Sequence, residues 1–211
     1  MRITEIFHSI QGESTHAGRP CVFVRLTGCP LRCTWCDTEY AFYGGRELTD
    51  DDILTKIRAF DCSLVEITGG EPLAQSACFP FVSKLCDAGY TVLIETSGAI
   101  DITAVDPRAH VILDVKCPGS GMTDRMHWSN LQKLTAKDEA KFVLADRADY
   151  DWACEVVNRY DLASRCTVLF SSAFGTLELR HLADWVLADR LPIRVQTQLH
   201  KLIWTPDMRG V

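Results

Sequence analysis

Three cysteines lie within one short segment of the chain. Cys29, Cys33 and Cys36 have the spacing CxxxCxxC. Three thiolates on one loop can hold a soft metal ion or an iron–sulfur cluster. A structural zinc ion needs four protein ligands, whereas a 4Fe–4S cluster held by three cysteines keeps one iron open to another ligand. The spacing therefore favours a cluster over zinc.

Two other uses of these thiols stay open. A zinc site would need His8, His16 or a distant cysteine as its fourth ligand. A redox pair of Cys33 and Cys36 would leave Cys29 without a role. The remaining cysteines stand singly, and we expect them to be small buried apolar side chains; they are Cys21, Cys62, Cys78, Cys86, Cys117, Cys154 and Cys166.

A second motif, Thr68-Gly69-Gly70-Glu71-Pro72, follows an apolar run. Two glycines let the backbone approach a ligand closely. The carboxylate of Glu71 can accept hydrogen bonds from an ammonium group. The motif is therefore a second candidate ligand loop.

The composition restricts the classes of protein. The chain has 211 residues and a net charge of −6, which argues against broad binding to nucleic acid or to membrane surfaces. No apolar run reaches the length of a membrane span. The first residues carry an acid, Glu5, where a signal peptide would have an apolar core, so we expect a cytoplasmic protein.

The elements that must position these motifs alternate along the chain. Short apolar runs predict strands at Cys21–Leu26, Leu64–Thr68, Thr91–Glu95, Val111–Asp114, Phe142–Ala145, Thr167–Phe170 and Ile193–Gln196. Helices are predicted at Asp50–Phe60, with Thr49 as its N-cap, and at Phe79–Ala88, Tyr150–Tyr160 and Thr176–Asp189. Residues 1–211 are thus predicted to form a single α/β domain, a partial, open βα barrel of parallel strands. In such folds the loops after the strands carry the chemistry, and the loop at 29–36 is one of them.

The cysteine motif and the Gly-Gly-Glu-Pro motif resemble those of the radical S-adenosylmethionine (SAM) superfamily. Further segments narrow the resemblance to 7-carboxy-7-deazaguanine synthases, enzymes of queuosine and deazapurine biosynthesis. These segments are Glu5–Ser14 (EIFHSIQGES), Cys36-Asp37-Thr38, Glu95-Thr96-Ser97-Gly98 and the C-terminal Gln198-Leu199-His200. They span nearly the whole chain.

The resemblance implies a 4Fe–4S cluster, SAM and Mg²⁺ as cofactors. The three cysteines would be catalytic ligands of the cluster. The residues implied around SAM are Trp35, Cys36, Asp37, Gly70, Glu71, Ser97, Asp114, Val115 and Lys116, of which the last three stand where many relatives have Ser-Pro-Lys. Thr38 would supply a hydroxyl to Mg²⁺.

The implied reaction is a carbon–nitrogen lyase reaction. It converts 6-carboxy-5,6,7,8-tetrahydropterin to 7-carboxy-7-deazaguanine with loss of ammonia. The residues implied around the pterin are Ile10, Gln11, Gly12, Glu13, Arg25, Thr68 and His200. A reducing flavodoxin- or ferredoxin-type electron donor and a homodimer are also implied, whereas nucleic acid and membrane partners are not expected.

Plainer interpretations stand beside these. Arg25 could pair with an acid such as Glu66, and Lys116 could form an ordinary ion pair. Glu13 could be a surface acid, Thr38 a helix cap, and Trp35 and His200 structural side chains. At the level of the whole chain, the alternatives are an activating enzyme for a glycyl-radical partner and a zinc-binding module.

Overall fold

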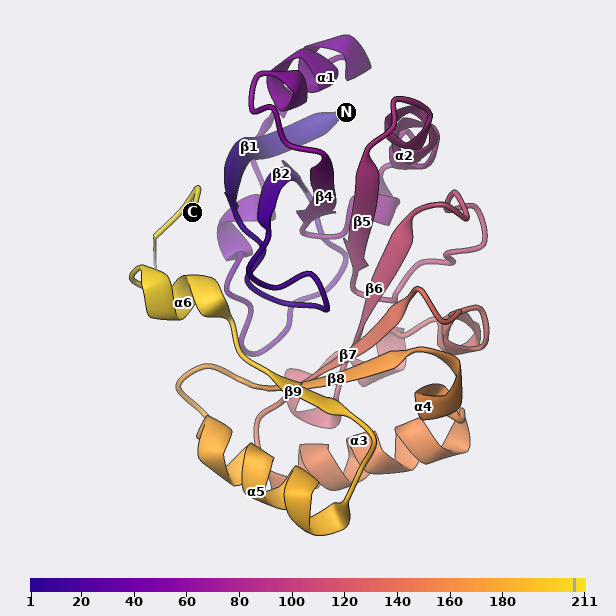
Figure 1. Ribbon diagram of the computed structural model, residues 1–211, viewed down its shortest axis with the longest axis vertical. Coiled ribbons are helices and arrows are strands. Elements are labelled where there is room, and N and C mark those ends of the chain that lie inside the picture. The colour runs from indigo at the N-terminus through magenta and orange to yellow at the C-terminus, as the bar shows by residue number, and fades with distance from the viewer. Residues whose placement is uncertain (207) are drawn as a thin grey trace.

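One curved sheet forms the centre of the molecule (Figure 1). The computed structural model describes residues 1–206 and 208–211, and within them the sheet has nine strands in the order β3-β1-β2-β4-β5-β6-β7-β8-β9. They are β1 (Arg2–Ile10), β2 (Pro20–Leu26), β3 (Arg46–Glu47), β4 (Leu64–Gly69), β5 (Thr91–Thr96), β6 (His110–Val115), β7 (Glu139–Leu144), β8 (Thr167–Ser172) and β9 (Arg194–Gln196). The sheet is open, because β3 and β9 are its two edges.

The helices cover the outside of this sheet. They are α1 (Asp50–Arg58), α2 (Cys78–Asp87), α3 (Arg147–Arg159), α4 (Leu162–Arg165), α5 (Leu179–Asp189) and α6 (Leu199–Ile203). In Figure 1, α1 and α2 lie outside one end of the sheet and α3 to α5 outside the other, while the yellow α6 lies across the open side, near β1. Among the described residues, no helix is both long enough and apolar enough to cross a bilayer.

The apolar runs become strands because both of their faces are covered. Val22 and Val24 of β2 pack, fully buried, in the same core as Ile53 and Ile57 of α1. The opposite face of β2 carries Phe23 and Arg25, which line a cavity inside the curve of the sheet. One face of each strand therefore builds the core, while the other is available to the site.

All seven predicted strands and four predicted helices are present, with ends that shift by up to three residues. Thr49 caps α1 as predicted, because its side chain accepts from the Asp52 N–H. Helix α3 begins earlier than predicted, at Arg147, since Asp146 accepts from the Asp149 N–H and caps it.

The predicted fold class, an open and mostly parallel α/β sheet, is confirmed, but one edge of the sheet is antiparallel. The strand β1, which was not predicted, is antiparallel to both β2 and β3, whereas β2 and β4 to β9 are parallel. The connection between β1 and β2 is residues 11–19, which contain no helix. A parallel pair needs a crossover of a dozen residues or more, so this short connection enforces antiparallel pairing.

The same connection closes one end of the barrel. Its Ser14 N–H donates to Gln196 Oε1 of β9 at 2.8 Å, and its Thr15 N–H donates to Glu139 Oε1 at the start of β7 at 3.0 Å. Residues 11–19 therefore connect strands that the sheet itself keeps apart.

Candidate active site

A cavity of about 900 Å³ opens at the carboxyl ends of the parallel strands and extends into the curve of the sheet. Seventeen of the nineteen predicted site residues line it. They are Ile10, Gln11, Gly12, Glu13, Arg25, Cys29, Cys33, Trp35, Cys36, Asp37, Thr38, Thr68, Gly70, Ser97, Asp114, Lys116 and His200. The two that do not are Glu71 and Val115, both fully buried behind it.

The three cysteines project from the loop after β2, and all three are partly exposed free thiols. The Leu31 N–H donates to Cys29 Sγ at 3.4 Å. Arg32 donates back to the Cys29 carbonyl at 2.9 Å, so the loop is held by its own residues.

A second loop supports the cysteine loop from the side. The Thr34 N–H donates to the Ser120 carbonyl at 3.1 Å, and the Arg32 N–H approaches Met122 Sδ at 3.3 Å. Residues 119–134, for which the sequence indicated no role, form short 3₁₀ helices here, at Thr123–Arg125 and Trp128–Gln132.

The Gly-Gly-Glu-Pro motif packs directly under the cysteine loop. A Cβ atom on Gly70 would lie 2.2 Å from the Gly28 carbonyl oxygen and 2.8 Å from Cys29 Cβ, so only glycine fits there. The Glu71 N–H donates to the same carbonyl at 2.8 Å. The motif thus fixes the distance between the β2 and β4 loops.

The Glu71 carboxylate is already satisfied by protein donors. It accepts from Leu73 N–H at 2.9 Å, from Thr96 Oγ1 at 2.9 Å and from Ser97 N–H at 2.7 Å, and it also contacts Ser97 Oγ. The contact of Glu71 with a ligand ammonium stays a prediction. The carboxylate joins the β4 loop to the end of β5.

The thiols fit a cluster by their chemistry. Burial raises the pKa of Cys29 and of Cys33, and the nearby Lys116 ammonium partly opposes this increase in both. Within residues 1–206 and 208–211, no three His, Cys, Asp or Glu side chains are close enough to hold a single metal ion. Three soft thiols on one loop beside a cation are suitable donors for an iron–sulfur cluster.

Asp114 and Lys116 form an ion pair at 2.9 Å beside the cysteines. Burial alone would lower the pKa of Lys116, but Asp114 holds it above its ordinary value. Asp114 Oδ1 is buried and has no hydrogen-bond partner among the described residues. Val115 between them points into the apolar core, as alternation along a strand requires.

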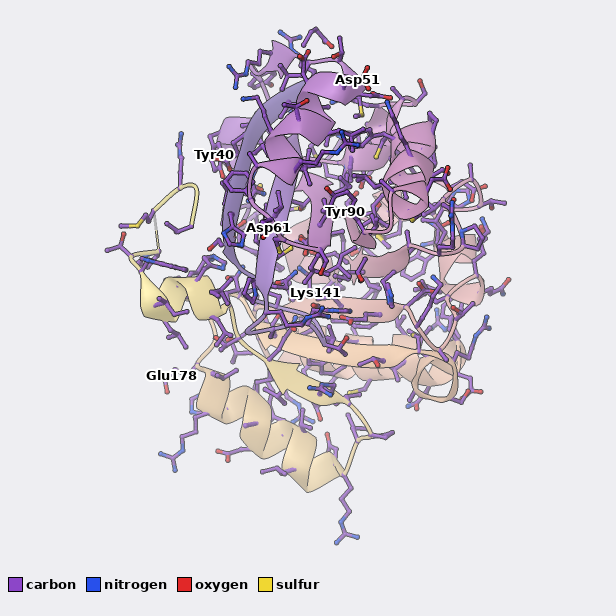
Figure 2. The ribbon with its side chains drawn as sticks, turned by 45° about the horizontal axis from the view of Figure 1, so that its top comes forward. Tyr40, Asp51, Asp61, Tyr90, Lys141 and Glu178 are labelled. Carbon is purple, nitrogen blue, oxygen red and sulfur yellow. The ribbon has the colours of Figure 1, made fainter. Side chains whose placement is uncertain are left out.

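The deeper part of the cavity is centred on a residue that the sequence analysis missed. Lys141 of β7 is 4% exposed, and Figure 2 shows it inside the sheet. Its Nζ lies 3.0 Å from Glu13, contacts Glu95 and lies 3.6 Å from Asp114. The only signal in the sequence was a lysine directly before a predicted apolar strand.

Arg25 forms an ion pair, but not with the acid that the sequence suggested. Its Nε donates to Glu5 Oε1 of β1 at 2.8 Å, and the Tyr40 hydroxyl donates to the same oxygen. Tyr40 lies beside β1 in Figure 2. Glu66 contacts Gln11 instead. The plainer interpretation of Arg25, an ion pair with an acid, is thus met by Glu5 and not by Glu66, because β1 had not been predicted as the neighbour of β2.

The segment leading into α6 closes the cavity. Gln198 Nε2 donates to Glu13 at 2.8 Å and to Asp37 at 3.1 Å, and Lys201 lies 2.9 Å from Asp37. Burial would raise the pKa of Asp37, but Lys201 and Gln198 lower it to about 2. One segment thus contacts both the residue after Cys36 and an acid of the β1–β2 loop.

His200 follows on the same segment. A Cβ atom on Gly12 would lie 2.9 Å from His200 Nδ1, so this contact also depends on glycine. Burial lowers the pKa of His200, which favours the neutral imidazole at neutral pH.

Comparisons with known proteins agree with this site. The sequence model of the Radical SAM superfamily matches residues 23–113. The crystal structure of QueE from Escherichia coli superposes on this chain with a TM-score of 0.76. The match covers 93% of each of the two chains at 23% sequence identity, which supports the fold. Fold and cysteine loop together define an enzyme of the radical SAM superfamily.

Full-length relatives define the family. The 7-carboxy-7-deazaguanine synthase of Chlorobaculum tepidum is 48% identical over all of this chain and 97% of its own length. That of Koribacter versatilis is 47% identical over the full length of both chains. The chain belongs to the 7-carboxy-7-deazaguanine synthase family. This membership favours neither a zinc-binding module nor a glycyl-radical activating enzyme.

Proposed function

We propose that this enzyme converts 6-carboxy-5,6,7,8-tetrahydropterin to 7-carboxy-7-deazaguanine, with loss of ammonia, in deazapurine biosynthesis. The observation that carries the proposal is the single cavity shared by the three cysteines and by the N-terminal Gln11-Gly12-Glu13 segment. Relatives of full length that are named for this activity support it.

At one end of the cavity, Cys29, Cys33 and Cys36 would hold a 4Fe–4S cluster, and SAM would bind beside it. The side chains proposed to surround SAM are Trp35, Asp37, Ser97, Asp114 and Lys116, with the backbone of Gly70. When bound, the reduced cluster and SAM supply the one-electron chemistry that removes a hydrogen atom from the substrate. Asp114 Oδ1, which has no hydrogen-bond partner in the described part of the chain, is a suitable acceptor for a ligand hydroxyl or amine.

At the other end, Glu13 and Gln11 would bind the donor edge of the pterin. Glu5 accepts from Nε of Arg25, and the two other nitrogens of the guanidinium would bind the substrate carboxylate. Thr68 and His200 would contact the ring. These groups position the substrate and exclude water.

The proposal also includes Mg²⁺, at Thr38. Thr38 lines the cavity, and its hydroxyl lies 3.8 Å from Cys36 Sγ. Mg²⁺ prefers oxygen ligands and keeps several waters, so Thr38 would supply one hydroxyl, and the substrate carboxylate and water the other ligands.

The proposal includes a reducing flavodoxin- or ferredoxin-type electron donor, a homodimer and a cytoplasmic location. The location is supported by ten cysteines that are all free thiols, because cytosolic proteins rarely keep disulfides.

The test is anaerobic reconstitution with iron and sulfide, followed by assay with SAM, dithionite and 6-carboxytetrahydropterin. We expect a brown protein that forms 7-carboxy-7-deazaguanine, with turnover stimulated by Mg²⁺. A colourless protein that binds one zinc ion, or a brown protein that cleaves SAM but leaves the pterin unchanged, would contradict the proposal.

A further inference from the structure

Glu66 is a buried acid in the middle of β4 that none of the roles above uses. It is 3% exposed and lines the cavity. Its neighbours across the sheet are Phe23 on β2 and Leu93 on β5, both buried and apolar. An acid in such a place needs an explanation.

Its contact is with the side chain of Gln11. Gln11 Nε2 donates to Glu66 Oε2, and Gln11 Oε1 accepts from the Glu13 N–H at 2.7 Å. Gln11 is itself 3% exposed. A Gln11 amide turned by 180° would oppose its NH₂ group to the Glu13 N–H, a donor against a donor. Both ends of this amide are thus fixed.

No cation pairs with Glu66 among the residues described here. The two cations that act on Glu66 are paired with other acids: Lys141 contacts Glu13, Glu95 and Asp114, and Arg25 pairs with Glu5. Burial first, and then the neighbouring Glu95, raise the pKa of Glu66. A buried carboxylate without a cation is costly, so the neutral acid is the stable form.

We propose that Glu66 is a neutral carboxylic acid and a positioning residue, which holds the Gln11 amide and, through it, the backbone at Glu13 in one orientation toward the substrate. The inference rests on the proposed function, because the substrate in question is the carboxytetrahydropterin. It assigns Glu66 no contact with the reacting atoms.

The test compares two substitutions. The amide oxygen of Glu66→Gln still accepts from Gln11 Nε2, whereas Glu66→Ala removes the acceptor. We expect the KM for the pterin to rise roughly tenfold or more in Glu66→Ala and to recover to within about threefold of wild type in Glu66→Gln. SAM cleavage without pterin, iron content and sulfide content should be retained in both.

Glu139→Ala is the matched control. Glu139 is equally buried and also holds the β1–β2 loop, through Thr15, but it does not line the cavity. We expect this variant to lower Tm without raising the KM. A similar KM increase in Glu139→Ala would mean that Glu66 acts only through general stability.

An infrared measurement tests the neutral acid without turnover. The wild-type protein at neutral pH should show a protonated-carboxylic-acid carbonyl band that Glu66→Gln lacks. If the two spectra match, or if Glu66→Gln is as impaired as Glu66→Ala, the inference is wrong. If the wild-type enzyme fails to convert the pterin while the band is present, the proposed function fails instead.

Discussion

The two ends of the cavity are built in different ways. At the cofactor end, the cysteines, Gly70 and Ser97 follow three neighbouring parallel strands, and short loops hold them. At the substrate end, Glu13 from the β1–β2 loop meets Lys141 from β7, 128 residues away in the chain, and Gln198, 185 residues away. The cofactor end depends on local motifs. The substrate end forms only when the curved sheet brings distant segments of the chain together.

The largest expected effect is at the cofactor end. Cys29→Ala, Cys33→Ala and Cys36→Ala should each abolish turnover, because three ligands leave no spare for the cluster. Iron and sulfide content with SAM cleavage measure this loss. Cys154→Ala, which changes a thiol far from the cavity lining, should keep both. Full iron content and turnover in any of the three variants would show that the cysteines do not act as a set.

At the substrate end, Lys141→Met should have the next largest effect. It leaves Glu13, Glu95 and Asp114 without their shared cation, and removal of one partner of a buried ion pair costs about 3–5 kcal/mol. Chemical denaturation measures the loss of stability, and the KM for the pterin measures the effect on the substrate end.

The control is Lys84→Met, which removes a half-exposed lysine that pairs with the exposed Asp51 at 2.9 Å outside the cavity. It should lower the free energy of unfolding by at most about 1 kcal/mol. If both lysine variants lose the same free energy of unfolding, the buried lysine of the substrate end contributes no more to stability than a surface lysine does.

Arg25→Lys tests the substrate end without removing charge. The lysine keeps a cation near Glu5 but loses the planar fork, so substrate binding should weaken by about 1–3 kcal/mol. SAM cleavage without pterin should survive, because the cysteine loop is unchanged. Wild-type pterin affinity in this variant, or loss of its cluster, would contradict a substrate role for Arg25.

Thr38→Ala should have the smallest effect and lies where the two ends meet. We expect a weaker response of turnover to Mg²⁺, with little change at saturating Mg²⁺, since water can replace one hydroxyl ligand. A Mg²⁺ titration of turnover measures this. An unchanged titration would leave Thr38 with a purely structural place beside Cys36.

The sequence predicted the parallel strands because continuous apolar runs such as those of β4 and β5 have few other structures available. It missed β1, where only Ile3 is buried and a register shift between Ile3 and Glu5 interrupts the alternation. Because of that omission, Glu66 rather than Glu5 was named as the acid that Arg25 could pair with. The cofactor motifs were predictable because the residues of each motif lie in one short segment, and their spacing in the sequence already indicates what they can bind.

Lys141 and Gln198 could not be placed as partners of Glu13 from sequence, because their contacts exist only after the sheet curves. Glu71 shows the opposite limit. Its type and motif predicted a ligand contact, which stays a prediction, and the hydrogen bonds to its oxygens from Leu73, Thr96 and Ser97 were not foreseen. A carboxylate in a motif indicates that an acceptor is needed, but not which donor will use it.

The β1–β2 connection has a consequence for amide hydrogen exchange. The Ser14 and Thr15 N–H groups are bonded to side chains of β9 and β7 rather than to a neighbouring strand. They can therefore exchange with solvent when the connection alone detaches, without loss of any strand pair. Exchange at these two amides should be faster than at Val22 or Val65 in paired central strands, and it should slow when the substrate end is occupied.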